Sequence, residues 1–451
     1  MCRAEGDRRT EVVSRPAHED NTRDGADWLP FGNGAEAQLR CNGRPRRRAS
    51  GNRVMARVFV TGGSGFIGRF LVRTLSAHDC QVTALVRRDP QADGPWPETA
   101  RPVYGDILEP DAYRREIQAA DYVFHLAGCL RSPQPEDFWR VNVGGLESLL
   151  KCCADGTKPP RVVVVSSLAA AGPSGNRPRT ESDPPQPISN YGRSKLDAER
   201  LAADFAHPVP ITIVRPPIVL GEGDLMGLKM FTAVARWGVH LHPTLKRTEY
   251  SVIHVADLTD LLWRAALSDR IVDADSFCRW ERATHVANVR LATNPAGPSH
   301  TADDAEQFLG KRPSGSGCQP SVPSLEASAS LGLLASQTAG TDPAGVFFAA
   351  AEALTYAELG RHIAAALGRR RVLVLPVAAA IIRWAGLAGQ WASRVRRRPV
   401  YLNADKAREI IAGSWVCSSD KARKQLGFSP QPLTLRLQET IESYRKAGWL
   451  R

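Results

Sequence analysis

From Met55 onward, the chain alternates between short runs of apolar, largely β-branched residues and longer amphipathic segments. The apolar runs predict strands at 57–61, 81–86, 102–104, 121–126, 161–166 and 210–215. The segments between them predict helices, including 65–77, 136–153 and 190–206. Uniformly apolar strands that alternate with helices are typical of a parallel sheet covered by helices on both faces. We therefore expect an α/β fold with a doubly wound parallel sheet.

Two segments lack this pattern. Residues 1–54 are rich in Arg, Gly, Asn and Asp, and predict a disordered tail or a misassigned start upstream of Met55. Residues 279–344 are rich in Ser, Ala, Gly, Pro and Thr, and predict a disordered low-complexity insertion. The pattern resumes at 346–348, and a helix is expected over 355–367, where Thr355 and Glu358 have capping-box spacing. The sequence thus divides into a sheet domain over 55–275 and a C-terminal lobe over 346–451, to which 216–250 contribute.

Charge changes this picture only at the C-terminal end. The formal net charge is +12, and residues 368–451 alone hold 17 Lys/Arg against 5 Asp/Glu, a surplus of the same size. Such a piece could face nucleic acid, an anionic membrane or an anionic substrate. No recognition module for nucleic acid accompanies it, so nucleic acid is not an expected partner. The favoured interpretation is a solvated basic face.

Cysteine usage and hydropathy suggest a compartment. The nine cysteines include no C-x-x-C pair and no spaced Cys/His cluster, which argues against a disulfide framework and against a metal site. The N-terminus lacks the apolar core of a signal peptide, and no apolar run reaches the roughly 18 residues of a spanning helix. A cytoplasmic location is therefore expected.

A glycine-rich turn follows the first expected strand. Residues 58–68 read VFVTGGSGFIG, which is a strand, a turn and the start of a helix. Gly62 permits the tight turn, Gly65 lets backbone N–H groups approach a pyrophosphate, and Gly68 lets the helix pack closely on the strand. Phe66 and Ile67 begin the helix whose positive end faces the phosphates. With strand and helix on both sides, the motif predicts a Rossmann-type dinucleotide site. A smaller C-terminal substrate-binding lobe is expected beside this domain.

The ends of the next two strands bear on the identity of the nucleotide. An acid at the end of the second strand usually binds the ribose hydroxyls of NAD, whereas this chain has Arg87 and Arg88 there. Guanidinium groups suit the 2′-phosphate of NADP, so NADP is favoured and NAD is the alternative. After the third strand, Asp106 and Ile107 lie where a carboxylate could meet the adenine amino group. Asp106 could equally cap the following helix.

A Tyr and a Lys share one face of the helix expected over 190–206. Tyr191 and Lys195 are four residues apart, and the ammonium can lower the phenol pKa so that the Tyr gives or takes a proton near neutral pH. Lys195 can also hold the nicotinamide ribose. The Tyr-x-x-x-Lys spacing follows a strand that ends at Ser166 and Ser167, in a chain that already carries the glycine motif.

Taken together, these motifs resemble the extended short-chain dehydrogenases/reductases of the NAD-dependent epimerase/dehydratase family. The resemblance implies that Ser167 holds the substrate oxygen, that Tyr191 is the general acid/base, and that Lys195 tunes it. It further implies that Ala127 and Gly128 run along the cofactor and that Pro217, after Pro216, lies by the nicotinamide carboxamide. Asn142 is either near the active site or a helix cap. The matching segments are 61–68, 105–107, 125–128, 141–145, 166–167, 191–195, 215–221 and 254–257.

Three functions remain open. The leading one is an NAD(P)-dependent oxidoreductase that moves hydride between the cofactor and a secondary alcohol or ketone, with a small molecule as its partner. The second is a sugar or nucleotide-sugar epimerase/dehydratase with tightly bound cofactor, and the third is a non-enzymatic NAD(P)-binding scaffold. Tyr250 and Ser251 stand where nucleotide-sugar enzymes of the family often carry an Arg-Asp pair, which disfavours the second. His254 is interpreted as structural rather than as a base, and a homodimer is left open.

One stretch near the C-terminus is both apolar and basic. Residues 372–398 include Trp384 and Trp391 and end in a cluster of arginines. A basic amphipathic helix with tryptophans can lie on a membrane surface. It can also line the substrate cleft, and this second interpretation is favoured because clefts are lined mainly by apolar and aromatic side chains.

Overall fold

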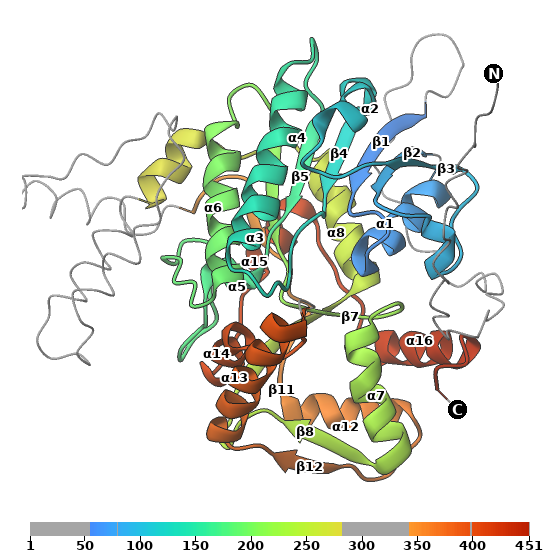
Figure 1. Ribbon diagram of the computed structural model, residues 1–451, viewed down its shortest axis with the longest axis vertical. Coiled ribbons are helices and arrows are strands. Elements are labelled where there is room, and N and C mark those ends of the chain that lie inside the picture. The colour runs from blue at the N-terminus through green and yellow to red at the C-terminus, as the bar shows by residue number, and fades with distance from the viewer. Residues whose placement is uncertain (1–54, 79, 282–341, 397–398, 451) are drawn as a thin grey trace, which may run out of the picture.

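A seven-stranded, fully parallel sheet forms the centre of the molecule (Figure 1). The computed structural model describes residues 55–78, 80–281, 342–396 and 399–450. The strand order β10-β6-β5-β4-β1-β2-β3 is that of a doubly wound Rossmann-type sheet, so the expected fold class is confirmed. The strands are β1 (Ala56–Thr61), β2 (Cys80–Val86), β3 (Ala100–Tyr104), β4 (Tyr122–His125), β5 (Arg161–Val165), β6 (Ile211–Arg215) and β10 (Val346–Phe348).

Alternate residues of the strands are buried against helices on opposite faces. Phe59 and Val123 pack on one side with α2 (Arg114–Ala119), α4 (Gly145–Ala154) and α6 (Asn190–Asp204). Val60 and Phe124 pack on the other side with α1 (Phe66–Ala77), α8 (Val255–Leu267) and α15 (Asp420–Leu426). Burial on both faces explains why these strands read as continuous apolar runs.

One expected helix is interrupted. The segment expected as a single helix over 136–153 consists of α3 (Glu136–Trp139), the π-helical turn η3 (Arg140–Gly144) and α4. A π turn adds a residue to the helical repeat and is often found at functional sites. Here it contains Asn142, which is buried.

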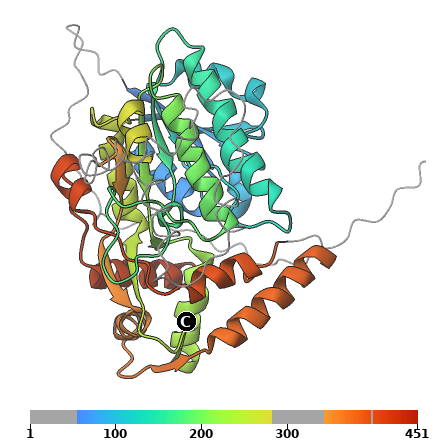
Figure 2. The same cartoon turned by 90° about the vertical axis from the view of Figure 1, so that its left-hand side faces the viewer.

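The smaller lobe lies below the sheet domain in Figures 1 and 2. Its core joins residues of α7 (Leu225–Trp237), α12 (Tyr356–Ala366) and α16 (Leu433–Lys446). The helix expected over 355–367 is α12, and Thr355 and Glu358 form the predicted capping box. The other elements are α13 (Ala379–Arg396), α14 (Ala404–Ile411), a three-stranded sheet of β11 (Glu352–Thr355), β9 (Glu249–His254) and β7 (Ile218–Leu220), and the pair β8 (Val239–His242) and β12 (Leu373–Pro376).

Both ends of the segment expected to be disordered over 279–344 are described by the structure. Residues 274–281 are helical, and Trp280 is buried in the core. At the other end, the Lys421 ammonium donates to the Pro343 carbonyl at 2.7 Å. The expected disorder over 279–344 is therefore wrong for 279–281 and for 342–344, because these residues pack against the sheet domain and α15. Residues 282–341, like the expected tail over 1–54, lie outside the described residues.

Candidate active site

The glycine turn has the backbone geometry of a phosphate cradle. Gly62 has a φ of +69°, and a Cβ there would lie 2.7 Å from the Ala127 nitrogen. A Cβ on Gly68 would lie 2.1 Å from the Gly62 carbonyl oxygen, so only glycine lets α1 begin this close to β1. The helix starts after Gly65 with no side-chain cap and no acid in its first turn. Its first N–H groups, around Phe66 and Ile67, are therefore suited to an anion.

The residues expected around the adenosine half of the dinucleotide follow β2 and β3. Arg87 comes directly after β2, which pairs with β1, and its side chain is exposed. Asp106 follows β3, and its Oδ1 accepts the Leu108 N–H at 3.0 Å, so it caps the local turn. Ile107 is buried against Gly145 at the start of α4. The helix that follows (Pro110–Ala112) has Glu109 as its N-cap, so Asp106 does not cap that helix.

The loop after β4 is held from two sides. The Ala127 N–H donates to Thr61 Oγ1 at 3.2 Å, which ties this loop to the end of β1. A Cβ on Gly128 would lie 3.4 Å from the Lys195 Nζ, so the loop passes directly beside this ammonium. Asn142 accepts the Cys129 N–H at 2.7 Å and donates to Ser194 Oγ at 2.8 Å. Asn142 is therefore no helix cap but a positioning residue that joins the β4 loop to α6.

The Ser167 and Tyr191 hydroxyls meet at the carboxyl end of β5. Ser167 caps the short helix α5 (Leu168–Ala171) by accepting the Ala169 N–H at 3.1 Å, and it lies close enough to Tyr191 to lower the pKa of that phenol. Burial raises the pKa of Tyr191 to about 12, although Ser167 and the Lys406 ammonium oppose this rise. The Pro216 carbonyl accepts the Leu168 N–H at 2.9 Å. This hydrogen bond holds the segment that contains Pro217 next to the start of α5.

The Lys195 ammonium is bound to the end of β5. It donates to the Val165 carbonyl at 2.9 Å. Burial lowers the pKa of Lys195 to about 8, with the Glu199 carboxylate opposing this change. The groups that dominate the Tyr191 pKa are its burial, Ser167 and the charged residues of the C-terminal lobe. The ammonium faces the β4 loop, where a ribose would pass.

The low pKa of Lys195 gives a prediction for activity. If its positive charge stabilises the tyrosinate formed during carbonyl reduction, kcat/KM should fall about tenfold per pH unit above pH about 8, as the amine loses its proton. A Lys195→Arg variant that still folds should extend the plateau upward, because a guanidinium stays charged. The measurement is the pH profile of kcat/KM. A wild-type profile that stays flat up to pH about 10 would show that this charge is not used.

A buried ion pair lies behind Lys195. Glu199 and Arg215 are both completely buried, and the Arg215 Nε lies 2.9 Å from Glu199 Oε1. Ser166 donates to the same carboxylate. The guanidinium is covered by the rings of Trp280 and Phe348, with centroids at 5.6 and 5.5 Å. The pair fixes the middle of α6 to β6, and so fixes the helix that carries Tyr191 and Lys195.

The C-terminal lobe fixes the other end of α6. The Asp405 carboxylate accepts the Asn190 N–H at 3.0 Å, at the positive end of the helix. Ser189, the N-cap, accepts the Gly192 N–H at 2.9 Å and donates to Glu409 at 2.5 Å. Glu409 also binds Lys406 at 2.7 Å. Sequence reasoning missed these residues of α14, because they lie more than 200 positions from Tyr191 and no local pattern marks them.

Two histidines near the site are structural. His254 caps α8 by accepting the Ala256 N–H at 3.2 Å, and its Nε2 lies 3.2 Å from Thr440 Oγ1. Burial lowers its pKa to about 3, so the ring is neutral. His125, at the end of β4, is hydrogen-bonded to Thr61 at 3.0 Å, and burial lowers its pKa to about 3 as well. The structural interpretation of His254 is confirmed.

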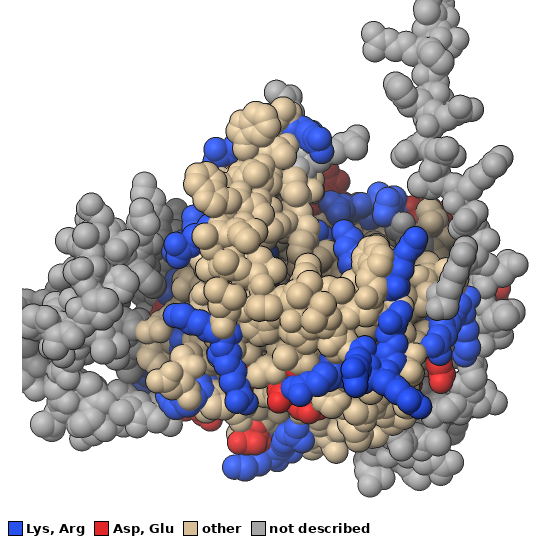
Figure 3. All heavy atoms as spheres, turned by 90° about the horizontal axis from the view of Figure 1, so that it is seen from below, with Lys and Arg blue, Asp and Glu red and all other residues tan. Residues whose placement is uncertain are grey.

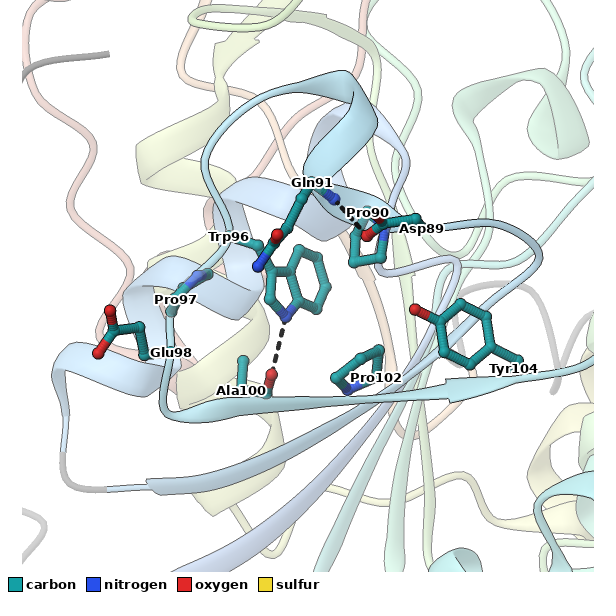
Figure 4. A pocket seen from close by; sticks show the side chains of 9 residues that line it. All are labelled: Asp89, Pro90, Gln91, Trp96, Pro97, Glu98, Ala100, Pro102 and Tyr104. Atoms are coloured by element: carbon teal, nitrogen blue, oxygen red, sulfur yellow. Dashed lines mark hydrogen bonds between the residues drawn. The ribbon is translucent and has the colours of Figure 1, made fainter. Parts of the chain in front are cut away.

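A polar pocket lies away from these catalytic candidates, at the edge of the sheet beyond β2 (Figure 4). It is bordered by Asp89, Glu98 and Tyr104, and the Trp96 indole across it donates to the Ala100 carbonyl at 2.8 Å. None of Ser167, Tyr191 and Lys195 lines it. The pocket therefore does not mark the position of the reacting group.

Sequence comparisons point to one family. Residues 58–277 match the NAD dependent epimerase/dehydratase family. The ceramide reductase of Caulobacter vibrioides is 36% identical over 201 residues, 44% of this chain and 57% of that protein. The 4-hydroxy-2-methyl-3-oxo-4-farnesyl-3,4-dihydroquinoline-1-oxide ketoreductase of Stigmatella aurantiaca is 34% identical over 176 residues, 37% of this chain and 52% of that protein. The chain thus spans little more than half the length of these relatives.

Solved structures agree on the fold. DesIV, a dTDP-glucose 4,6-dehydratase from Streptomyces venezuelae with NAD and TYD bound, superposes with a TM-score of 0.58 over 88% of this chain and 99% of its own, at 19% identity. MoeE5 in complex with UDP-glucuronic acid and NAD gives 0.55 over 87% and 100%, at 21% identity. At such identities the likeness shows the fold alone.

Proposed function

Because the chain belongs to the NAD dependent epimerase/dehydratase family, we propose that it is an oxidoreductase that interconverts a ketone and a secondary alcohol. The observation that carries this proposal is the proximity of Ser167 and Tyr191, with the Lys195 ammonium one helical turn after Tyr191 and beside Gly128. Two hydroxyl donors that converge on one point, at the carboxyl end of a parallel sheet, suit a carbonyl oxygen that becomes negatively charged.

The residues at the glycine turn fit a nicotinamide dinucleotide. The uncapped start of α1 suits its pyrophosphate, and Gly62, Gly65 and Gly68 leave no side chain in the way. Ala127 and Gly128 would run along the nucleotide, and Lys195 would hold the nicotinamide ribose. When bound, the cofactor would supply or accept a hydride at the substrate carbon. The structural neighbours named above carry NAD. For this chain we propose NADP, on the strength of Arg87.

The side chains would then handle the oxygen and its proton. Ser167 and Tyr191 would both donate hydrogen bonds to the carbonyl oxygen, and these bonds strengthen as negative charge develops on it. Tyr191 is protonated at neutral pH because its pKa is about 12, so it is ready to give its proton to the alkoxide. Lys195 would stabilise the tyrosinate that remains.

The surroundings of Ser167 favour simple oxidation and reduction over dehydration. Loss of water from a sugar requires a further acid or base that removes a proton from carbon or protonates the leaving hydroxyl. The helix that follows Ser167 offers only Leu168 and three alanines, all buried. Lys406 and Glu409, which influence Tyr191 from α14, are ion-paired with each other.

One assay separates the functions. The full chain is given NADPH or NADH and a panel of ketones, sterols and nucleotide sugars, while cofactor absorbance and product are followed. An oxidoreductase consumes cofactor in a one-to-one ratio with product. An epimerase or dehydratase turns over substrate with no net change in cofactor, and this result would replace the proposal by the alternative. If neither nucleotide binds in a titration, both proposals fail.

The cofactor preference has its own test. Arg87→Ala should raise KM for NADPH by about 10–100-fold, because a charge-assisted hydrogen bond contributes about 1.5–3 kcal/mol, and should leave KM for NADH unchanged. Arg115→Ala, at an exposed position of α2, is the matched control and should change neither value. If the Arg87 substitution moves both KM values equally, Arg87 does not bind a 2′-phosphate.

A further inference from the structure

The outer face of the β8–β12 pair is apolar although it is exposed. The two strands are parallel, with Leu241 opposite Leu375 and Val239 opposite Leu373. Side chains alternate along a strand, so His240 and His242 are buried while Leu241, at 60% exposure, points outward. Leu375 and Leu373 are exposed beside it. Trp237 and Leu245, which flank β8, are exposed as well.

Helix α13 presents a second apolar strip. Trp384 and Trp391 are 72% and 70% exposed, and Ile381, Leu387 and Val395 are exposed at helical spacing with them. The opposite side of the helix packs on α14, where a Cβ on Gly386 would lie 2.7 Å from that of Ala407. The two indoles therefore point away from the protein, and the expectation that they line the cleft is wrong for them. In Figure 2 α13 projects to one side of the lobe.

The charges around these residues are almost all of one sign. Neither 225–248 nor 359–404 contains an Asp or Glu, while together they contain 13 Lys and Arg. Figure 3 looks onto this end of the molecule and shows a broad uncharged area bordered mainly by Lys and Arg, with a few Asp and Glu along its lower border. The exposed basic residues of these two segments include Lys229, Arg236, Lys246, Arg247, Arg369, Arg370, Arg371, Arg383, Arg394 and Arg396.

We propose that this surface, formed by α13 and the outer face of β8–β12, binds an anionic phospholipid bilayer. Exposed apolar patches of this kind mark interaction sites, and tryptophans with arginines are suited to the boundary between headgroups and acyl chains. The basic border complements anionic headgroups. A second copy of the chain would instead bring two basic, acid-free surfaces together, so charge disfavours self-association here.

The binding would be interfacial. Within the described residues, no helix is long and apolar enough to cross a membrane. Helix α13 has 18 residues and carries Arg383, Arg394 and Arg396, so it would lie in the plane of the interface with its indoles toward the acyl chains. Helix α14 follows α13 directly and binds the start of α6 through Asp405. The docked surface would thus lie close to the site that holds Tyr191.

Vesicle binding by the full chain tests this proposal. We expect the protein to co-sediment with vesicles of phosphatidylcholine and phosphatidylglycerol, to bind weakly to phosphatidylcholine alone, and to be released by salt. Brominated lipids should quench its tryptophan fluorescence. Trp384→Ser/Trp391→Ser should lower the partition coefficient at least about tenfold, because two large apolar side chains no longer enter the interface. Arg383→Gln/Arg394→Gln should weaken binding only to the anionic vesicles.

Two matched variants lie far from this surface. Tyr104→Ser removes an exposed aromatic ring from β3, and Arg115→Gln/Lys158→Gln removes two exposed charges from the sheet domain. Both should bind vesicles as the wild type does. The proposal is overturned if the wild type does not bind anionic vesicles, or if the tryptophan variant, folded by circular dichroism, binds equally well. It is also overturned if sedimentation without lipid shows a dimer that this variant dissociates.

Discussion

Tyr191→Phe lowers kcat for carbonyl reduction by about 10²–10⁴-fold, which is the usual contribution of a positioned general acid. The substitution removes only the hydroxyl. The ring stays packed against Phe138, with centroids 6.4 Å apart, and the helix keeps its cap at Ser189. We therefore expect the Kd for NADPH to change little, since the phenol oxygen acts on the substrate and not on the nucleotide. Steady-state kinetics and a fluorescence titration with NADPH measure the two effects.

Two further variants sharpen this test. Ser167→Ala removes the second donor to the same oxygen and should also lower kcat, by about 10²–10³-fold. Tyr356→Phe is the matched control, because Tyr356 is a half-buried tyrosine of the lobe that packs on Tyr250. It should retain wild-type kcat. A Tyr191→Phe enzyme with wild-type turnover would refute the mechanism while leaving the family assignment untouched.

Glu199→Leu destabilises the protein by about 3–5 kcal/mol, because it leaves the Arg215 guanidinium buried without a counter-charge. Ser166 loses its acceptor in the same step. Urea denaturation followed by circular dichroism measures the loss in the free energy of unfolding. The double variant Glu199→Leu/Arg215→Met replaces the pair by apolar side chains of similar volume and should recover much of it.

An exposed ion pair serves as the control for the loss of stability expected in Glu199→Leu. Arg101 and Glu116 lie 3.2 Å apart, with the Arg101 side chain 60% exposed. Glu116→Ala should therefore cost at most about 1 kcal/mol. If Glu199→Leu costs no more than Glu116→Ala, Arg215 must find water or another acceptor in the folded protein, and the buried pair does not fix α6.

The sheet domain could be predicted because its strands, helices and glycine turn are each determined by residues that are close together in the sequence. Strands that are buried on both faces appear in the sequence as apolar runs. The glycine turn combines a positive φ at Gly62 with a close backbone approach at Gly68 that no other residue type permits. Tyr191 and Lys195 were found for the same reason, since four residues bring them to one helix face.

The missed parts depend on contacts between distant segments. The π turn holds Asn142, whose amide joins the Cys129 backbone to Ser194, and helical periodicity does not reveal these contacts. Trp280 lies next to a low-complexity stretch, yet it is buried over Arg215. The Tyr191 pKa also depends on burial and on charges of α14, which the Tyr-x-x-x-Lys spacing does not reveal.

The attachment of α14 to the start of α6 also sets an order of events during synthesis. Tyr191 precedes Asp405 by 214 residues, and a ribosome that adds about 5–20 residues per second needs roughly 10–40 s to cover that distance. During that interval the nascent chain already contains the glycine turn, Ser167 and Lys195, but the start of α6 has no acceptor from the lobe. It follows that all the residues proposed to bind nucleotide are synthesised before those that fix the start of α6, whereas β10, which completes one edge of the sheet, is synthesised in between.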